Sequence, residues 1–459
     1  MPRKPKRSIL EYYPYPTFRP GHKELLLAIE SNWKDLEIIL IVAAPGVGKT
    51  ALRRTIAYWA ADSIMTVPTN DLLRQELLEF PNTRKILGRD LYDGNDSAYY
   101  RDLDLVSQRG RPILCVPHSV IARRYNRFNK AVYLSRKVFI ADEGHRYIQL
   151  NQDLQATHLW RRDAQFPPYV SDRPTFEEFL TFSNQTKKVK TIRDKLLTND
   201  YMIKREKALL RGNFEDRIAL IPLFPDIHNS LFRSPEKLIF MSATINELDI
   251  YDLGISKEKR ITKFELPSII PKENRPLIPL NIVKVSINNM NYAATALANS
   301  INELANFHRG QKGLVHATYA TAAALRPLLG SDSRYLFHTA DSIERKAKFD
   351  IWRQSEDKIY IASGYEEGID LKGDEYEWQA ITRIPWPSLG DPAIRKKVEI
   401  TGQHWYIWQA LKPTIQATGR ICRGADDYGV TYILDSNWDR LISEADKYNL
   451  IPDFFKEIL

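Results

Sequence analysis

Short apolar runs rich in β-branched residues alternate along the chain with longer stretches of helical periodicity. This alternation is typical of α/β proteins in which helices join parallel strands. The first series of expected strands comprises residues 36–44, 63–68, 112–117, 137–143 and 237–244. The second series comprises residues 312–318, 358–363, 377–385 and 429–435. The pattern therefore predicts two α/β units, each built around a parallel sheet.

Two segments interrupt this pattern. Four prolines between residues 265 and 280 discourage regular structure and indicate a linker. A long segment after His145 separates two strands of the first series, so we expect an insertion there. The insertion should be mainly helical, because Val189, Ile192 and Leu196 recur at helical spacing. The predicted parts are a first domain of 1–149 and 233–265, an insertion of 150–232, a linker of 266–280 and a second domain of 281–459.

Composition narrows the function classes. The 459 residues contain no apolar run of 18, and the N-terminal octet lacks the apolar stretch of a secretory signal, so we expect a cytoplasmic protein without membrane contact. Two cysteines, Cys115 and Cys422, cannot form a disulfide framework. Lysine and arginine exceed aspartate and glutamate by nine, which favours a polyanionic partner.

A nucleotide site is indicated by APGVGKT at residues 44–50, which follows an expected strand and opens an apolar helix. Backbone N–H groups at that helix end would bind phosphate. Lys49 would neutralise the β- and γ-phosphates, and Thr50 would ligate Mg²⁺. The first position of the usual motif, a glycine, is Ala43 here. The expected nucleotide-binding loop residues are Pro45, Gly46, Val47, Gly48, Lys49 and Thr50.

Two further motifs supply charged groups. The strand at 137–143 ends in Asp142 and Glu143, at the sheet edge where α/β proteins bind ligands. We assign Asp142 to Mg²⁺ and Glu143 to activation of the attacking water. In QATGRICR, Arg420 and Arg423 lie three residues apart, on one helical face, and could reach one phosphate together.

The order of these motifs resembles superfamily 2 helicases, particularly the XPD and DinG branch. The resemblance extends from Phe18 to Trp438 and implies an α/β fold with two RecA-like helicase domains. It rests also on FRPGH at 18–22, VPTNDLLRQEL at 67–77, SAT at 242–244, EEGIDLKG at 366–373, IPWPSLGDP at 384–392 and GADDYGVTYILDSNW at 424–438. In this branch the segment at 67–77 contacts the nucleic-acid strand.

The resemblance assigns roles to matching positions. It gives Lys49, Thr50, Asp142, Glu143, Arg420 and Arg423 the same roles as the residue chemistry does. Ser242 and Thr244 would couple hydrolysis to domain movement, and His145 would connect to them. The other nucleotide-site residues implied are His22, Glu367, Gly368, Asp370, Gln416 and Gly419.

Some positions depart from the branch. His22 stands where the branch has an adenine-recognising glutamine, and Gly144 replaces an alanine. GRDLYDG at 88–94 has Gly94 where the branch has its first iron–sulfur cysteine, and the other cluster cysteines are missing too. The expected cofactors are therefore ATP and Mg²⁺ without an iron–sulfur cluster.

The resulting hypothesis is an intracellular, monomeric, ATP-driven motor that moves 5′ to 3′ on single-stranded DNA and unwinds forked DNA, in repair, replication or recombination. RNA is the less favoured substrate. Two alternatives stay open, namely a translocase that remodels DNA without processive unwinding and a P-loop nucleotide switch. Candidates for base stacking are Trp352, Trp386, Trp405 and Trp408, although a place in the core is the better interpretation for any single one of them.

Overall fold

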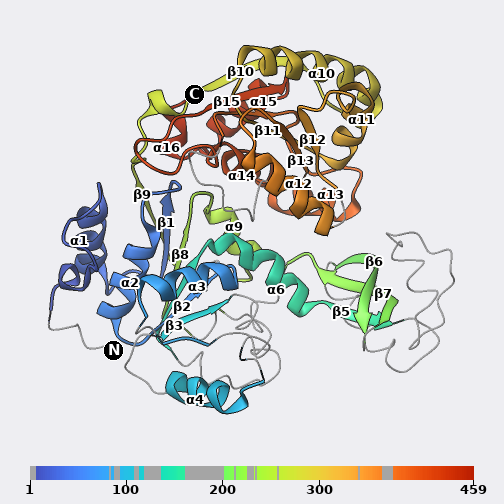
Figure 1. The fold of residues 1–459 in the computed structure, drawn as a ribbon. Helices are drawn as coiled ribbons and strands as arrows, with labels where there is room; N and C mark the ends of the chain where they lie inside the picture. Colours follow the sequence, from blue (N-terminus) through green and yellow to red (C-terminus); the bar gives the residue numbers. More distant parts are fainter. Residues whose placement is uncertain are drawn as a thin grey trace.

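A computed structural model describes residues 7–81, 84–86, 92, 94–107, 113–117, 136–160, 201–210, 213–224, 232, 235–255, 258–339, 342–363 and 376–459. Within these ranges the chain forms two α/β domains, one above the other in Figure 1, with a small sheet at one side. The second domain is yellow to red in this view, and the first is blue to green.

The first domain contains a six-stranded parallel sheet with the order β3-β2-β4-β8-β1-β9. Its central strands are buried apolar runs, as expected of a sheet covered on both faces. The strands are β1 (Ile38–Ala43), β2 (Ser63–Val67), β3 (Ile113–Pro117), β4 (Val138–Asp142), β8 (Lys237–Ser242) and β9 (Ile261–Leu266). The helices are α1 (His22–Asn32), α2 (Lys49–Ala60), α3 (Asn70–Glu79), α4 (Asp96–Ser107), α6 (Tyr147–Gln155) and α9 (Glu247–Asp252).

The second domain contains another six-stranded parallel sheet, with the order β10-β15-β14-β11-β13-β12. The strands are β10 (Leu277–Val283), β11 (Gly313–Ala317), β12 (Tyr335–Phe337), β13 (Ile359–Ser363), β14 (Trp378–Ile381) and β15 (Val430–Asp435). The helices are α10 (Met290–Phe307), α11 (Tyr319–Leu329), α12 (Ser342–Gln354), α13 (Pro392–Thr401), α14 (Gln403–Thr418), α15 (Trp438–Lys447) and α16 (Asp453–Lys456). All nine strands expected from the sequence are present, and the two-domain α/β fold is confirmed.

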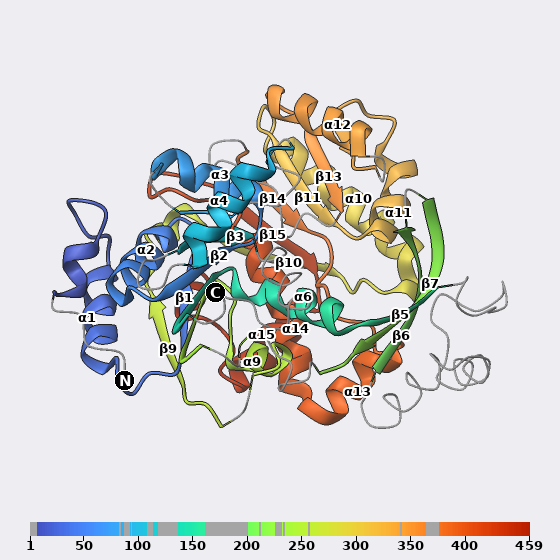
Figure 2. The same ribbon diagram turned by 90° about the horizontal axis from the view of Figure 1, so that it is seen from below.

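The prediction of a mainly helical insertion is wrong for the part that the structure describes. There β5 (Thr157–Trp160), β6 (Tyr201–Leu210) and β7 (Asn213–Pro222) form an antiparallel sheet with the order β5-β7-β6. Figure 2 shows this sheet at the side of the molecule, near α13. β6 and β7 are joined by a two-residue connection, which favours a hairpin over a helix. The segment around Val189 lies outside the described residues.

The linker is shorter than the proline content suggests. Residues 277–280 belong to β10, which pairs with β15 although it contains Pro279. β10 is an edge strand, and an edge strand tolerates a proline because one side of its backbone has no strand partner. The connection between the two sheets is thus residues 267–276. Among the described residues, no helix is both long and apolar enough to span a membrane.

Candidate nucleotide site and interdomain contacts

The predicted phosphate-binding loop connects β1 to α2 at the carboxyl edge of the first sheet. Gly46 and Gly48 have φ angles of +78° and +98°, a region that favours glycine. Gly46 also has no space for a side chain, because a Cβ there would lie 1.8 Å from the backbone oxygen of Arg423. Since α2 begins at Lys49, the loop amides lie at a helix N-terminus, which favours an anion. This conformation suits the binding of phosphate.

Two cations on α2 face the two carboxylates at the end of β4. Lys49 Nζ lies 3.4 Å from Glu143 Oε1, and Arg53 Nη1 donates to Asp142 Oδ2 at 2.9 Å. Asp142 Oδ1 accepts the backbone N–H of Glu143 at 3.1 Å. The structure therefore brings Lys49, Asp142 and Glu143 together, as predicted. Sequence reasoning missed Arg53, although its place four residues after Lys49 on the same helical face was an available signal.

The backbone of Glu143 determines the position of its carboxylate, and its surroundings determine the charge. Its φ angle of +46° is uncommon for a residue with a side chain, and it turns the chain sharply after β4. Desolvation acts to raise the pKa of Glu143, but the charge of Lys49 and a hydrogen bond from Ser242 are among the influences that outweigh it, so the pKa is lowered. The carboxylate is thus ionised near neutral pH, as a general base must be.

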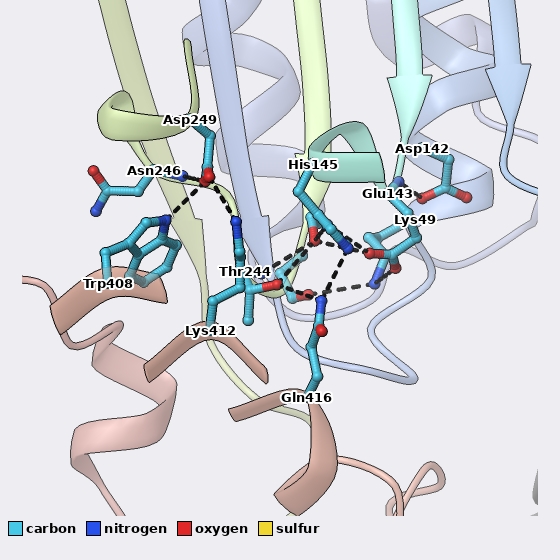
Figure 3. Close-up of polar contacts among 12 residues, drawn as sticks. Lys49, Asp142, Glu143, His145, Thr244, Asn246, Asp249, Trp408, Lys412 and Gln416 are labelled. Carbon is cyan, nitrogen blue, oxygen red and sulfur yellow. Dashed lines mark hydrogen bonds and ion pairs between the residues drawn. The ribbon is translucent and has the colours of Figure 1, made fainter. Parts of the chain in front are cut away.

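A chain of hydrogen bonds, here called the relay, leads from Glu143 to the second domain (Figure 3). Ser242 Oγ donates to Glu143 Oε2 at 2.8 Å and lies 3.0 Å from His145 Nδ1. Gln416 Nε2 lies 3.0 Å from His145 Nε2 and donates to Thr244 Oγ1 at 2.8 Å.

The predicted arginine motif follows α14 and packs on the phosphate-binding loop through its backbone. A Cβ on Gly419 would lie 3.1 Å from Pro45 Cγ, so the two residues are in close contact. The backbone oxygen of Arg423 lies against Gly46, as described above. The two domains therefore already meet at the loop.

The side chain of Arg420 is buried close to His316 of the second sheet. Arg420 is buried, and its charge acts on His316 of β11. Burial lowers the pKa of His316 to about 4, and Arg420 contributes in the same direction. Contact of Arg420 and Arg423 with a γ-phosphate stays a prediction.

The remaining predicted residues differ in where they lie. The ring of His22 is fully buried, with Nδ1 2.8 Å from the hydroxyl oxygen of Tyr13, and burial lowers the pKa of His22 to about 4. A neutral, enclosed ring offers no exposed edge to a base in this conformation. Glu367, Gly368 and Asp370 lie outside the described residues.

The groups expected to hold Mg²⁺ suit that ion chemically. Thr50 offers a hydroxyl in the first turn of α2, and Asp142 offers a carboxylate at the end of β4. Mg²⁺ prefers oxygen and is usually held by one or two protein groups together with phosphates and water. Among the described residues, no three His, Cys, Asp or Glu side chains gather as a metal-binding group, and such a Mg²⁺ site requires none.

A second contact between the domains, here called the anchor, involves α13 and α14 of the second domain, and Figure 3 shows the part of it around Asp249. It consists of Asp249 and Asp252 on α9, each of which accepts one ammonium and one indole N–H from the second domain. Asp249 is bonded by Lys412 at 2.8 Å and Trp408 at 3.0 Å, and Asp252 by Lys397 at 2.7 Å and Trp405 at 2.8 Å. Both carboxylates are buried, so each charge depends on these partners.

Two of the tryptophans considered for base stacking belong to the anchor. Trp405 and Trp408 are buried at the domain interface, and Trp352 is buried within the second domain. Trp386 is half-buried and lies 5.1 Å from Tyr406 between ring centroids. The sequence signal for the anchor was the spacing of Trp405, Trp408 and Lys412, which repeats on one face of a helix.

Comparisons with known proteins agree with this geometry. Residues 16–167 match the family described as type III restriction enzyme, res subunit, and residues 314–445 match the helicase C-terminal domain. Xpd4 of S. tokodaii superposes with a TM-score of 0.63 at 12% identity, covering 93% of this chain and 97% of that chain. Another XPD helicase structure superposes with a TM-score of 0.63 at 12% identity, covering 95% and 99%.

Curated relatives match over shorter stretches. Regulator of telomere elongation helicase 1 of Homo sapiens is 29% identical over 84 residues, which is 15% of this chain and 7% of the relative. The homologue of Drosophila melanogaster is 29% identical over 101 residues, which is 19% and 10%. The chain thus spans about a tenth or less of the length of these relatives.

Two RecA-like domains with a nucleotide site between them define the class of protein. The chain carries a helicase C-terminal domain at residues 314–445, and its fold is similar to that of the XPD helicases.

Proposed function

We propose that this protein is an ATP-dependent DNA helicase that translocates on single-stranded DNA and unwinds duplexes. The observation that carries the proposal is the relay, since it joins Glu143 in the first domain to Gln416 in the second. A nucleotide switch needs no such connection to a second α/β domain. A motor does, because each hydrolysis event must change how the two domains grip the strand.

The chemistry follows from the side chains at the loop. Glu143 would accept the proton of the attacking water, since its carboxylate is ionised and Ser242 orients it through Oε2. Lys49 is paired with Glu143 in this structure. Its ammonium would instead contact the β- and γ-phosphates when ATP is bound. Bound Mg²⁺ would neutralise phosphate charge next to Thr50 and Asp142. Arg420 and Arg423 would complete the site from the second domain.

The proposal also includes the location, oligomeric state, substrate and direction of movement of the motor. The motor would act as an intracellular monomer, with single-stranded or forked DNA favoured over RNA and 5′ to 3′ movement by resemblance to its branch. It would work without an iron–sulfur cluster, because the sequence has two cysteines where such a cluster needs four. The domain boundaries, with the linker shortened to 267–276, and the site residues other than His22 are part of this proposal.

The test is ATP turnover measured with no polynucleotide, single-stranded DNA, duplex DNA and RNA, followed by strand displacement from 5′-tailed and 3′-tailed forks. We expect stimulation by single-stranded DNA and unwinding from the 5′ tail. Stimulation without strand displacement would favour the remodelling translocase, and turnover indifferent to every polynucleotide would favour the nucleotide switch. Unwinding from a 3′ tail would contradict the polarity. Stoichiometric iron, needed for activity, would contradict the cluster-free motor.

A further inference from the structure

A buried cluster of four charges lies behind the nucleotide site. Arg53 on α2 binds Asp142 at the end of β4 and Glu76 on α3. Arg54 lies 3.4 Å from the other oxygen of Glu76 and stacks on Phe80, with its guanidinium carbon 3.7 Å from the ring centroid. The side chains of Arg53 and Glu76 are only 2% and 3% exposed. The cluster is therefore shielded from water and depends on its internal pairing.

Arg53 divides its two outer nitrogens between two carboxylates on different elements. Nη1 binds Asp142 and Nη2 binds Glu76. The guanidinium is planar and rigid, so a shift of one carboxylate changes the contact with the other. Because Glu76 already holds the guanidinium in close contact, a movement of Glu76 away from β4 draws the guanidinium with it and lengthens its contact with Asp142. Arg53 is thus placed to transmit a movement of α3 to the end of β4.

α3 is the helix that a bound nucleic-acid strand would contact. It follows β2 directly, within the segment 67–77 that resembles the strand-binding motif, and Thr69 caps it by accepting the backbone N–H of Leu72 at 3.3 Å. Leu72 and Leu78 are 40% and 86% exposed, whereas Glu76 is buried. One face of α3 is therefore open to a ligand while another holds Arg53.

The contact with Arg53 matters for the cation at Asp142. Asp142 Oδ2 is bonded to the guanidinium, and Oδ1 accepts the backbone N–H of Glu143. A guanidinium in direct contact with this carboxylate opposes a second cation at the same group. Relaxing the Arg53 contact would make Asp142 a better ligand for Mg²⁺ or for its water shell.

We propose that Arg53 is a positioning residue that couples strand binding at α3 to the readiness of Asp142 for Mg²⁺. When a strand engages α3, Glu76 draws Arg53 away from Asp142, and Asp142 is released toward the metal. This inference rests on the proposed function. It adds a direct connection within the first domain, independent of the relay.

The test is an equilibrium titration of Mg²⁺ with a fluorescent, non-hydrolysable ATP analogue, with and without oligothymidylate. In the unmodified protein, oligothymidylate should lower the Mg²⁺ concentration for half-saturation about five-fold or more, a typical coupling between sites. Arg53→Lys should bring this ratio close to one, because an ammonium keeps the charge but not the fork. Glu76→Gln removes the negative partner on α3 and leaves Arg53 intact. In this variant the Mg²⁺ concentration for half-saturation should stay high both with and without oligothymidylate.

Arg54→Lys is the matched control, since Arg54 neighbours Arg53 and binds the other oxygen of Glu76. It should retain the ratio of the unmodified protein, with folding of all variants checked by thermal unfolding. A ratio of one in the unmodified protein, or an unchanged ratio in both Arg53→Lys and Glu76→Gln, would overturn the inference. Failure of the unmodified protein to bind oligothymidylate would instead overturn the proposed function beneath it.

Discussion

The relay and the anchor join the same two domains, but they are built from different groups. The relay ends in an amide, Gln416, that contacts an imidazole and a hydroxyl. The anchor consists of two buried carboxylates, each bonded to an ammonium and an indole. Neutral hydrogen bonds contribute little net free energy because water can replace them, whereas an unpaired buried charge is costly.

This difference indicates how the domains would move. Separation at the relay exposes polar groups that can form hydrogen bonds with water, so it costs little free energy. Separation at the anchor would leave Asp249 and Asp252 without their cations. We therefore expect the domains to stay joined at the anchor and to open and close at the nucleotide site.

The largest effect should come from breaking the anchor on one side. Asp249→Ala leaves the ammonium of Lys412 and the indole N–H of Trp408 buried without their acceptor, which should cost about 3–5 kcal/mol. Urea denaturation should show this loss in the free energy of unfolding. Asp249→Asn, which keeps an acceptor for Trp408, should lose less. Equal stability of Asp249→Ala and the unmodified protein would remove the distinction between the two contacts.

A smaller effect, on rate rather than stability, is expected at the start of the relay. Glu143→Gln should lower ATP turnover about 100-fold, or about 2.7 kcal/mol, because a positioned general base contributes at least that much. Binding of a fluorescent ATP analogue should persist, since Lys49 is unchanged. Near-normal turnover would show that Glu143 does not activate water.

The smallest effect concerns the pH dependence of turnover. The pKa of Glu143 lies below its ordinary value of 4.5, so its ionised form, and the stability it contributes, is complete above that value and is lost as pH falls through the lowered pKa. Ser242→Ala removes one influence that lowers the pKa. The acid limb of kcat/KM against pH should therefore move to higher pH, and a shift to lower pH would contradict this role of Ser242.

The sequence predicted the central strands and the edge strand β3, but it missed the other three edge strands of the two parallel sheets. β9, β10 and β12 were not expected, and each lies at the edge of its sheet. Edge strands are covered less, so they lack the continuous apolar runs by which central strands are recognised. In β10 only the first and last residues, Leu277 and Val283, are buried.

Local motifs likewise predicted part of the site. APGVGKT and the Asp142–Glu143 pair indicated their chemistry because their neighbours in the chain are their neighbours in space. The link between Arg53 and Glu76, and that between Asp249 and Lys412, join residues far apart in the chain. No local pattern specifies such pairs, which depend on how the elements pack.

The most direct test of the account is ATP turnover by Gln416→Ala with and without single-stranded DNA. Gln416 is the only member of the relay, as defined here, that comes from the second domain. We expect Gln416→Ala to stay within about 1 kcal/mol of the unmodified stability, since the anchor is intact, yet to lose most of the stimulation by DNA. Stimulation equal to that of the unmodified protein would contradict the claim that the relay carries the signal between the domains.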